Sequence, residues 1–220
     1  MKPRSLLAVI TLFLGALAGL LAIILLLSRL TADNVPEAVA ERQRQWAEQG
    51  FYQFNPPRQL TTVALLDLQQ QPVTFPAPGN HWQLVNFGYL FCPDICPINL
   101  RLLADIKTAW DQQHPQYPLT VTHITFDPER DTPADLKTYL AYHHPEFTGL
   151  TGELKAIRQV ARQLNVTFIH EPPDEYGNYF ISHSDSIALL NPQGQFVGLF
   201  KGPYRREVIE EVLGAVIIGL

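Results

Sequence analysis

The chain has few cysteines, with only Cys92 and Cys96 among its 220 residues. Iron–sulfur clusters and structural zinc sites generally take four protein ligands, so two thiols cannot complete either of them. Two cysteines are also too few to hold a domain together through disulfides, and a hydrophobic core must therefore carry the fold. A basic stripe is missing as well, because the 16 Lys and Arg residues are scattered and the formal net charge is -5. This pattern argues against a nucleic-acid partner.

Polar side chains are nearly absent from the N-terminal region. Between Leu6 and Leu27 the only side chain able to form a hydrogen bond is that of Thr11. About 20 apolar residues are enough to cross a bilayer as a helix, so this stretch predicts a single transmembrane helix. It is longer than the apolar core of a signal peptide, and no small-x-small cleavage site follows it, which favours an uncleaved anchor.

The charges on either side of this stretch predict its orientation. Lys2 and Arg4 precede it without any acid, whereas the residues after it mix Arg29 with Asp33, Glu37 and Glu41. The positive-inside rule keeps the N-terminus in the cytoplasm and exports the rest of the chain. We therefore expect a single-pass protein of the inner (cell) membrane whose domain lies on the periplasmic, exported side.

Three regions follow from this pattern. Residues 1–30 hold the cytoplasmic tip and the transmembrane anchor, residues 31–57 form a stalk and linker, and residues 58–220 form one domain. The stalk is expected to be helical and to end in a stiff linker at Pro56 and Pro57. No internal repeat or low-complexity block is visible in the chain.

The domain alternates between short apolar runs and helical periodicity. Strands are expected at residues 62–66, 73–75, 84–89, 119–126, 166–169, 186–190 and 195–200, and helices at residues 98–110, 132–142, 152–164 and 205–217. Regular helix after the cysteines is expected from Pro97, because proline disfavours a helical conformation at the residue before it. This order predicts an α/β fold with helices on both faces of a mixed sheet.

Cys92 and Cys96 lie just beyond the end of the first central strand, where the chain passes into a helix. Open α/β sheets tend to place their sites beyond the carboxyl ends of the strands. The N–H groups and the dipole at the start of the helix favour a thiolate at Cys96. Two neighbouring thiolates can form a structural disulfide, act as a redox dithiol or hold a soft cation such as Cu(I), and the spacing alone leaves all three open.

A metal held by two thiolates needs a further ligand, and the chain has seven histidines. His183 is the strongest candidate, because it lies in a loop that can approach the start of the helix after the cysteines. The alternative for His183 is a polar loop residue without any ligand role. Copper bound by two thiolates and one imidazole fits the available side chains best.

Four short motifs resemble those of the Sco/SenC copper-chaperone family, in the same order and at similar spacing. They are Gly88-Tyr89 with Cys92-Pro93-Asp94-Ile95-Cys96-Pro97, then Asp127-Pro128-Glu129-Arg130-Asp131-Thr132-Pro133, then Gly149-Leu150-Thr151-Gly152, and finally His183-Ser184 ahead of a strand and an Asn-Pro-x-Gly turn. The resemblance covers about residues 60–200, and the predicted N-terminal anchor matches as well.

This resemblance implies a thioredoxin-like fold and copper bound by Cys92, Cys96 and His183. Proteins of this family assist assembly of the binuclear copper (CuA) centre of cytochrome c oxidase, by delivering copper, by reducing the target's cysteines, or both. The implied partner is the copper-bearing subunit of that oxidase or another cuproprotein. In relatives the acid that opens the second motif lies near the metal, so Asp127 is a supporting candidate. The alternative for Asp127 is a turn-initiating aspartate before proline.

Two positions depart from the family pattern. Relatives often carry Thr-His before the first cysteine and Asp before the metal-binding histidine, whereas this chain has Leu90-Phe91 and Ser182. Neither change removes a proposed ligand. An acid beside the histidine would help to orient it, so its loss is expected to affect metal affinity or partner recognition.

Other functions fit the same residues. A thiol–disulfide oxidoreductase, which would make the protein an enzyme, would use Cys92 as the attacking thiol and Cys96 as the resolving one. A peroxidase would need an activating partner for its thiol that the sequence does not identify. An anchored interaction domain would carry an inert disulfide and take up no metal after reduction.

Overall fold

The computed structural model describes residues 13–21, 23–24 and 36–219. The chain divides into two compact units, Met1–Gln45 and Trp46–Leu220. Residues 13–21 and 23–24 are helical and expose their apolar side chains. Within the described ranges, no helix combines the length and the apolar character that a membrane span requires. The predicted span between Leu6 and Leu27 lies partly outside these ranges, so the anchor stays a prediction.

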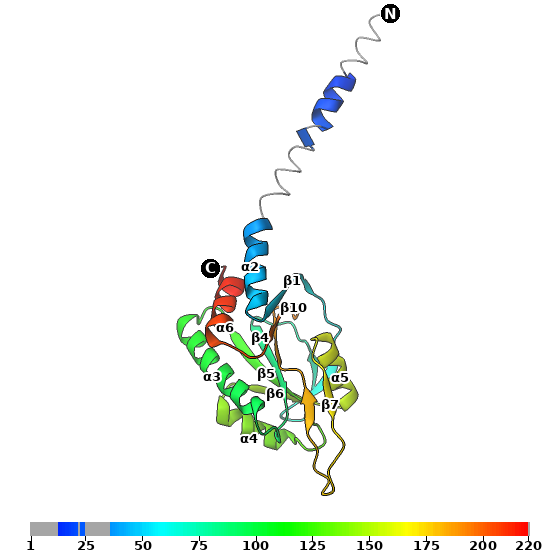
Figure 1. The fold of residues 1–220 in the computed structure, drawn as a ribbon, viewed down its shortest axis with the longest axis vertical. Helices are drawn as coiled ribbons and strands as arrows, with labels where there is room; N and C mark the ends of the chain where they lie inside the picture. The colour runs from blue at the N-terminus through cyan, green and yellow to red at the C-terminus, as the bar shows by residue number, and fades with distance from the viewer. Residues whose placement is uncertain (1–12, 22, 25–35, 220) are drawn as a thin grey trace, which may run out of the picture. The chain divides into compact units, whose positions relative to one another are not determined.

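One mixed sheet forms the centre of the second unit (Figure 1). Its strands are Phe51–Arg58 (β1), Val63–Asp67 (β2), Pro72–Phe75 (β3), Trp82–Gly88 (β4), Leu119–Thr125 (β5), Thr148–Thr151 (β6), Ser186–Leu190 (β9) and Phe196–Lys201 (β10). Their order across the sheet is β1-β10-β9-β4-β5-β6-β2-β3. The central pairs β4–β5 and β5–β6 are parallel, and the other neighbours are antiparallel.

Helices cover both faces of this sheet. Figure 1 shows α3 (Ile95–Gln113), α4 (Pro133–His143) and α6 (Arg206–Leu213) on one face and α5 (Leu154–Gln163) on the other. The π-helix η1 (Gly214–Ile218) follows α6, and α2 spans Pro36–Glu48. The expected α/β fold is therefore confirmed. The predicted start of α4 is confirmed too, because Thr132 is the N-cap and accepts a hydrogen bond from the Asp135 N–H at 3.2 Å.

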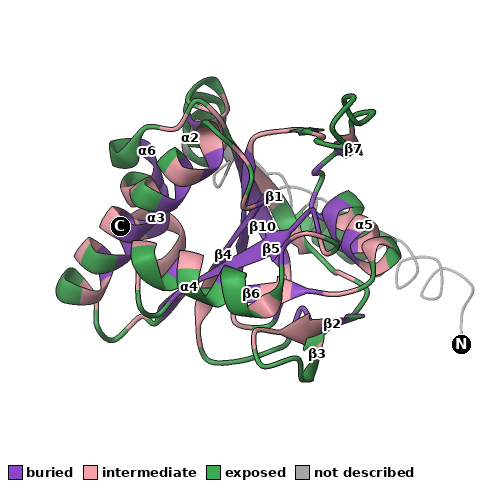
Figure 2. Cartoon of the chain, turned by 90° about the horizontal axis from the view of Figure 1, so that it is seen from below, coloured by how far each residue is buried: buried purple, intermediate pink, exposed green. Residues whose placement is uncertain are grey.

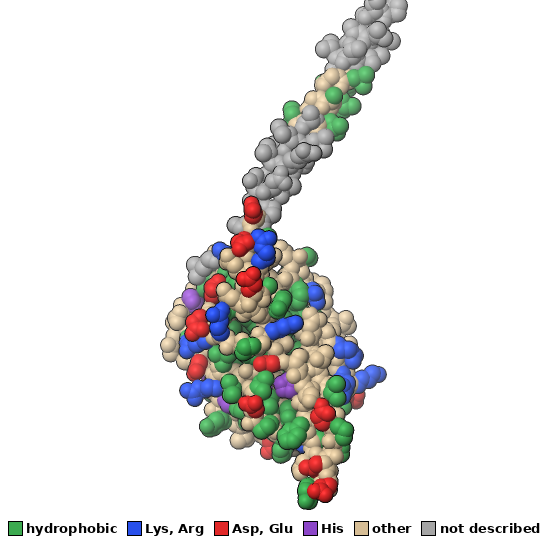
Figure 3. Space-filling view, viewed as in Figure 1, with side chains coloured by type: hydrophobic (Ala, Val, Ile, Leu, Met, Phe, Trp, Pro, Cys, Tyr) green, Lys and Arg blue, Asp and Glu red, His purple; other side chains and the backbone are tan. Residues whose placement is uncertain are grey.

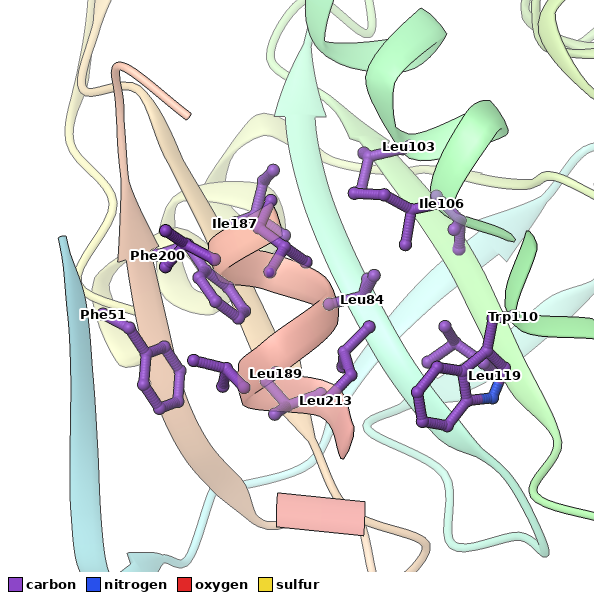
Figure 4. Packing of buried hydrophobic residues seen from close by; sticks show 14 of the residues in the cluster. Phe51, Leu84, Leu103, Ile106, Trp110, Leu119, Ile187, Leu189, Phe200 and Leu213 are labelled. Carbon is purple, nitrogen blue, oxygen red and sulfur yellow. The ribbon is translucent and has the colours of Figure 1, made fainter. Parts of the chain in front are cut away.

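The core lies in two clusters, one on each side of the sheet. Leu84 of β4 packs in the cluster that contains Leu103 of α3 and Leu213 of α6 (Figure 4). Its neighbour Val85 belongs to the other cluster, with Ile157 of α5. Figure 2 shows the buried residues along the central strands and the exposed ones on the outer sides of the helices. Burial on both faces explains why β4 appears in the sequence as a mostly apolar segment and not as an alternating one.

Residues 51–57 are a strand and not the linker that their prolines suggested. This segment is β1, which pairs antiparallel with β10, and Phe51 lies opposite Phe200. The register shifts between Gln53 and Arg58, around the two prolines. Proline has no N–H to donate to a neighbouring strand, so it is rarely found in the middle of a sheet. It is acceptable in an edge strand such as β1, which pairs on one side only. The folded domain therefore begins before residue 58.

Two further differences concern short elements near the cysteines. β7 (Phe168–His170) pairs with β8 (Ile181–His183) in a separate two-stranded sheet, although a single strand was expected at residues 166–169. β6 was not predicted either, and it contains only four residues. Strands of three or four residues are too short to show a clear period of two.

Candidate metal centre

The segment after β4 places both cysteines at one end of the sheet. The Cys92 N–H donates to the Tyr89 carbonyl at 3.2 Å, which closes a turn directly after the strand. α3 begins at Ile95, so Cys96 is its second residue and not its cap. The proline at position 97 is tolerated, because N–H groups in the first turn of a helix have no intrahelical acceptor. Cys96 is 2% exposed, whereas Cys92 is half-buried.

The fold brings Cys92, Cys96 and His183 together. One ligand atom from each of them lies within 4.8 Å of the others, and Cys96 Sγ is 3.9 Å from His183 Nε2. His183 was expected in a loop, but it is the last residue of β8. The two thiols thus come from the β4–α3 connection and the imidazole from the β7–β8 hairpin, which lies some 87 positions further along the chain.

The imidazole of His183 is held in one orientation. Its Nδ1 lies 3.1 Å from the Ser184 carbonyl, an arrangement in which Nδ1–H donates and Nε2 faces the thiols. The ring packs against Phe126, at 4.9 Å between centroids, and its edge contacts Tyr89. In a metal-ligating imidazole, a hydrogen bond from the ring nitrogen that does not bind the metal fixes the tautomer and raises the basicity of the other nitrogen.

The two thiols share their proton unequally. Hydrogen bonding with Cys96 is the largest cause that lowers the pKa of Cys92 to about 4, and His183 and the backbone N–H groups of Asp94 and Cys96 add to it, although burial opposes them. The pKa of Cys96 is raised, because its thiol donates to Cys92 and is more deeply buried. Burial lowers the pKa of His183, but hydrogen bonds to Cys92 and Ser184 and the negative charges of Cys92 and Asp185 outweigh it, so the net pKa is raised. Without a metal, the site therefore holds one thiolate, at Cys92.

This arrangement predicts a pH-insensitive alkylation of Cys92 in the reduced, metal-free protein. An ordinary thiol has a pKa of about 8.5 and loses about tenfold in thiolate per pH unit below it. Because the pKa of Cys92 lies near 4, its thiolate persists as the pH falls and is lost only around that value. Brief iodoacetamide treatment at pH 5, 6 and 7, followed by peptide mass spectrometry, should give nearly equal labelling of Cys92 and little of Cys96. Labelling of Cys92 that falls tenfold per unit would contradict the shared-proton arrangement.

Asp127 is buried near this site, but its carboxylate is already occupied. The hydroxyl of Tyr179 donates to Oδ1 at 2.8 Å, and Arg130 Nε donates to Oδ2 at 2.5 Å. The Arg130 guanidinium in turn lies 3.5 Å from the centroid of the Tyr179 ring. Asp127 is not part of the three-residue group, so the geometry does not bring it together with the ligands. It connects the loop after β5 to the β7–β8 hairpin, and its support of metal binding stays a prediction.

A residue that the sequence analysis did not single out fixes the backbone before the cysteines. Asp131 is fully buried and accepts hydrogen bonds from the Leu90 N–H at 3.1 Å and from Thr125 Oγ1 at 2.6 Å. Burial raises its pKa to about 6, although both hydrogen bonds oppose this shift. The motif at residues 127–133 contains Asp131, but nothing in the sequence shows that it reaches the backbone of Leu90.

The surface around the site is partly apolar. Phe91, which directly precedes Cys92, is 59% exposed, and the Arg130 guanidinium lies 4.9 Å from the centroid of its ring. Ile98 of α3 is 62% exposed. Figure 3 shows acidic and apolar side chains together at the tip of the β7–β8 hairpin, where Asp174 and Glu175 are exposed. The departure at Leu90-Phe91 thus presents an aromatic ring to the solvent beside the thiols.

The set of donor atoms defines which metals the site can hold. Thiolate sulfur is a soft donor that selects Cu(I) and zinc, and imidazole nitrogen also binds both copper and zinc. Structural zinc sites are almost always four-coordinate, whereas only three donors converge among the described residues. Two thiolates and one imidazole therefore fit Cu(I), and they do not complete a structural zinc site.

Comparison with known proteins agrees with this geometry. The family model described as SCO1/SenC matches residues 58–217. A protein of Stutzerimonas stutzeri named "Putative copper-binding protein" is 33% identical over 164 residues, which is 73% of this chain and 78% of that protein. The mitochondrial SCO1 homolog of Mus musculus is 37% identical over 119 residues, or 54% of this chain, and the match spans only 42% of that protein.

Solved structures of similar fold lead to the same family. Arabidopsis thaliana ScoI with copper bound has a TM-score of 0.67 and 27% identity, with 73% of this chain and 98% of that one covered. Yeast Sco1 with copper bound has a TM-score of 0.67 and 28% identity, with 74% of this chain and 91% of that one covered. These likenesses confirm the predicted thioredoxin-like α/β fold. Sequence, fold and the clustered cysteines and histidine agree, and the chain belongs to the SCO1/SenC family.

Proposed function

We propose that this protein is a copper metallochaperone that binds copper through Cys92, Cys96 and His183 and passes it to another protein. One observation carries the proposal: two sulfurs and one imidazole nitrogen converge within 4.8 Å. The Cys92 thiolate is already favoured in the absence of metal, because its pKa is lowered to about 4. Metal ligands must be deprotonated, so this lowered pKa reduces the cost of loading copper.

The relatives support copper as the cargo. The Stutzerimonas stutzeri relative is named a putative copper-binding protein, and the plant and yeast structures contain copper. The chain spans about half the length or less of several mitochondrial relatives, so their partners do not transfer directly. We propose the copper-bearing subunit of cytochrome c oxidase, or another cuproprotein, as the recipient.

The apolar N-terminal stretch supports a location for this activity. We propose that residues 6–27 anchor the chain in the inner membrane and that the domain lies on the exported side. Thiols on that side are exposed to oxidants. Oxidation of both thiolates to a disulfide removes two electrons from the pair. The disulfide no longer offers thiolate ligands to copper, so the redox state would control copper loading.

A second function is favoured by a specific observation. Cys92 is half-exposed and carries the lowered pKa, whereas Cys96 is buried and carries the raised one. This is the arrangement of an attacking and a resolving thiol in a thiol–disulfide oxidoreductase. Such an enzyme would reduce the cysteines of the recipient protein instead of delivering the metal.

Replacing His183 with alanine separates these two functions. A metallochaperone should lose affinity for Cu(II) strongly and for Cu(I) less, because both thiolates remain. An oxidoreductase should keep most of its turnover with a disulfide substrate, since neither thiol is changed. The 220-residue chain, reduced and freed of reductant under anaerobic conditions, is titrated with each copper ion and assayed for disulfide reduction in parallel. Uptake below one copper per chain in the wild type would refute the metallochaperone proposal.

A further inference from the structure

A half-buried carboxylate beyond the three ligands, that of Asp185, joins the parts of the chain that carry them. Asp185 lies two residues after His183, and Asn99 lies three residues after Cys96. Asn99 Nδ2 donates to Asp185 Oδ1 at 2.8 Å, and Asn99 is only 6% exposed. This hydrogen bond connects the first turns of α3, where Cys96 lies, to the segment between β8 and β9, which directly follows His183.

A third segment meets the same oxygen. The hydroxyl of Tyr204, just before α6, also donates to Asp185 Oδ1 at 2.8 Å. The backbone between β10 and α6 is equally close, because the Gly202 N–H donates to the Asp185 carbonyl at 3.2 Å. A Cβ at Gly202 would lie 2.2 Å from Asp185 Oδ2, so only glycine leaves room for this carboxylate. Two distant segments, the start of α3 and the connection between β10 and α6, thus meet at the Asp185 side chain.

The other side of His183 is held by the neighbouring strand. The Ser184 N–H donates to the Thr167 carbonyl at 2.9 Å, and Ser184 Oγ accepts from the Thr167 N–H at 3.1 Å. These bonds attach residue 184 to the start of the β7–β8 hairpin, but they do not connect it to the cysteines. Within the part of the chain that the structure describes, residues 183–185 meet α3 at two places, through His183 Nε2 beside Cys96 Sγ and through the hydrogen bond from Asn99 to Asp185.

We propose that Asp185 is a positioning residue that holds the imidazole of His183 at its distance from Cys96, through hydrogen bonds from Asn99 and Tyr204. This inference rests on the proposed copper site and extends it to residues that do not touch the metal. It also accounts for Ser182, where relatives often carry an acid: in this chain the carboxylate near the histidine follows it in the sequence. Loss of a group that orients a metal-ligating histidine typically costs about 10–100-fold in metal affinity.

Substitution of Asp185 tests the proposal in the 220-residue chain. D185A removes the acceptor, and we expect its affinity for Cu(II) to fall by about 10–100-fold, with loss of the imidazole nitrogen coupling in the EPR spectrum. D185N keeps an oxygen that can accept both hydrogen bonds, so it should stay close to wild type in both measurements. D67A is the matched control, because Asp67 also accepts two hydrogen bonds, from Gln69 and Gln71 in the β2–β3 turn. It should leave copper binding unchanged.

A measurement without copper separates this inference from the copper proposal. In the metal-free protein, the ring resonances of His183 in NMR spectra should shift and broaden in D185A, but not in D185N or D67A. If the wild type binds no copper yet shows this NMR difference, the copper proposal fails and the positioning role stands. If D185A keeps the wild-type ring resonances and the wild-type Cu(II) affinity, the positioning role is refuted.

Two milder variants cover the case in which D185A does not fold. N99L and Y204F each remove one donor and leave the carboxylate in place. Each should move the His183 resonances part of the way and weaken Cu(II) binding less than D185A. Wild-type behaviour of both variants would refute the positioning role. A D185N protein that binds Cu(II) as weakly as D185A would also refute it, because the effect would then come from the charge and not from the hydrogen bonds.

Discussion

Replacing Cys96 with serine is expected to abolish tight Cu(I) binding. Residues that only orient a ligand contribute up to about 100-fold to metal affinity. Because this substitution removes a ligand itself, we expect the Cu(I) affinity to fall by more than that factor. Serine offers a hard hydroxyl oxygen that stays protonated near neutral pH, whereas Cu(I) prefers soft thiolate sulfur. The substitution is nearly isosteric, so the buried position at the start of α3 should keep its packing.

Competition with a chromophoric Cu(I) chelator measures this affinity directly. S182A is the matched control, because Ser182 directly precedes His183 but is exposed and is not part of the three-residue group. It should bind Cu(I) like the wild type. A C96S protein that competes as well as the S182A protein would show that copper is bound elsewhere in the chain.

Replacing Phe51 with alanine is expected to lower the free energy of unfolding by about 3–5 kcal/mol, which is typical of a fully buried phenylalanine. Phe51 is 0% exposed, and its ring centroid lies 4.4 Å from that of Phe200. Both side chains are labelled in Figure 4. A Cβ at Gly198 would lie 2.4 Å from Cζ of the same ring, so the absence of a side chain on β10 provides the space for Phe51. The strand that was taken for a linker therefore supplies a part of the core.

Urea unfolding of Y52A provides the comparison for this effect. Tyr52 is the next residue of β1 and is 42% exposed, with only the Lys201 ammonium over its ring at 5.0 Å. Its loss should change the free energy of unfolding by about 0.5 kcal/mol, as is usual for surface positions. Equal, small effects of F51A and Y52A would mean that residues 51–58 contribute little to the fold.

The order of helices and strands could be predicted because the central elements have strong patterns. β4 is mostly apolar, and α4 has its cap residue and its proline in the expected places. β1 was missed because Pro56 and Pro57 are poor strand formers, and only its position at the edge of the sheet makes them acceptable. The start of α3 was predicted two residues late. The prediction relied on the rule that proline disfavours a helical conformation at the preceding residue, although a proline in the first turn of a helix is tolerated.

The candidate site could be predicted only in part. Cys92 and Cys96 lie four positions apart in the sequence, and the motif around His183 is short and local. The hydrogen bond from Asn99 to Asp185 joins residues 86 positions apart, and no pattern in either segment indicates it. Such contacts depend on how the segments meet in space, which the order of helices and strands does not determine.

The division of the site between two sheets has a consequence for how the metal can leave. Cys92 and Cys96 follow the central sheet, whereas His183 belongs to the separate β7–β8 hairpin. Displacing that hairpin would lower the coordination number from three to two while both sulfurs stay in place. A recipient that contacts the exposed hairpin tip would therefore supply its own ligand before either thiolate dissociates from the copper ion. Transfer would then proceed by exchange of one ligand at a time, without free copper.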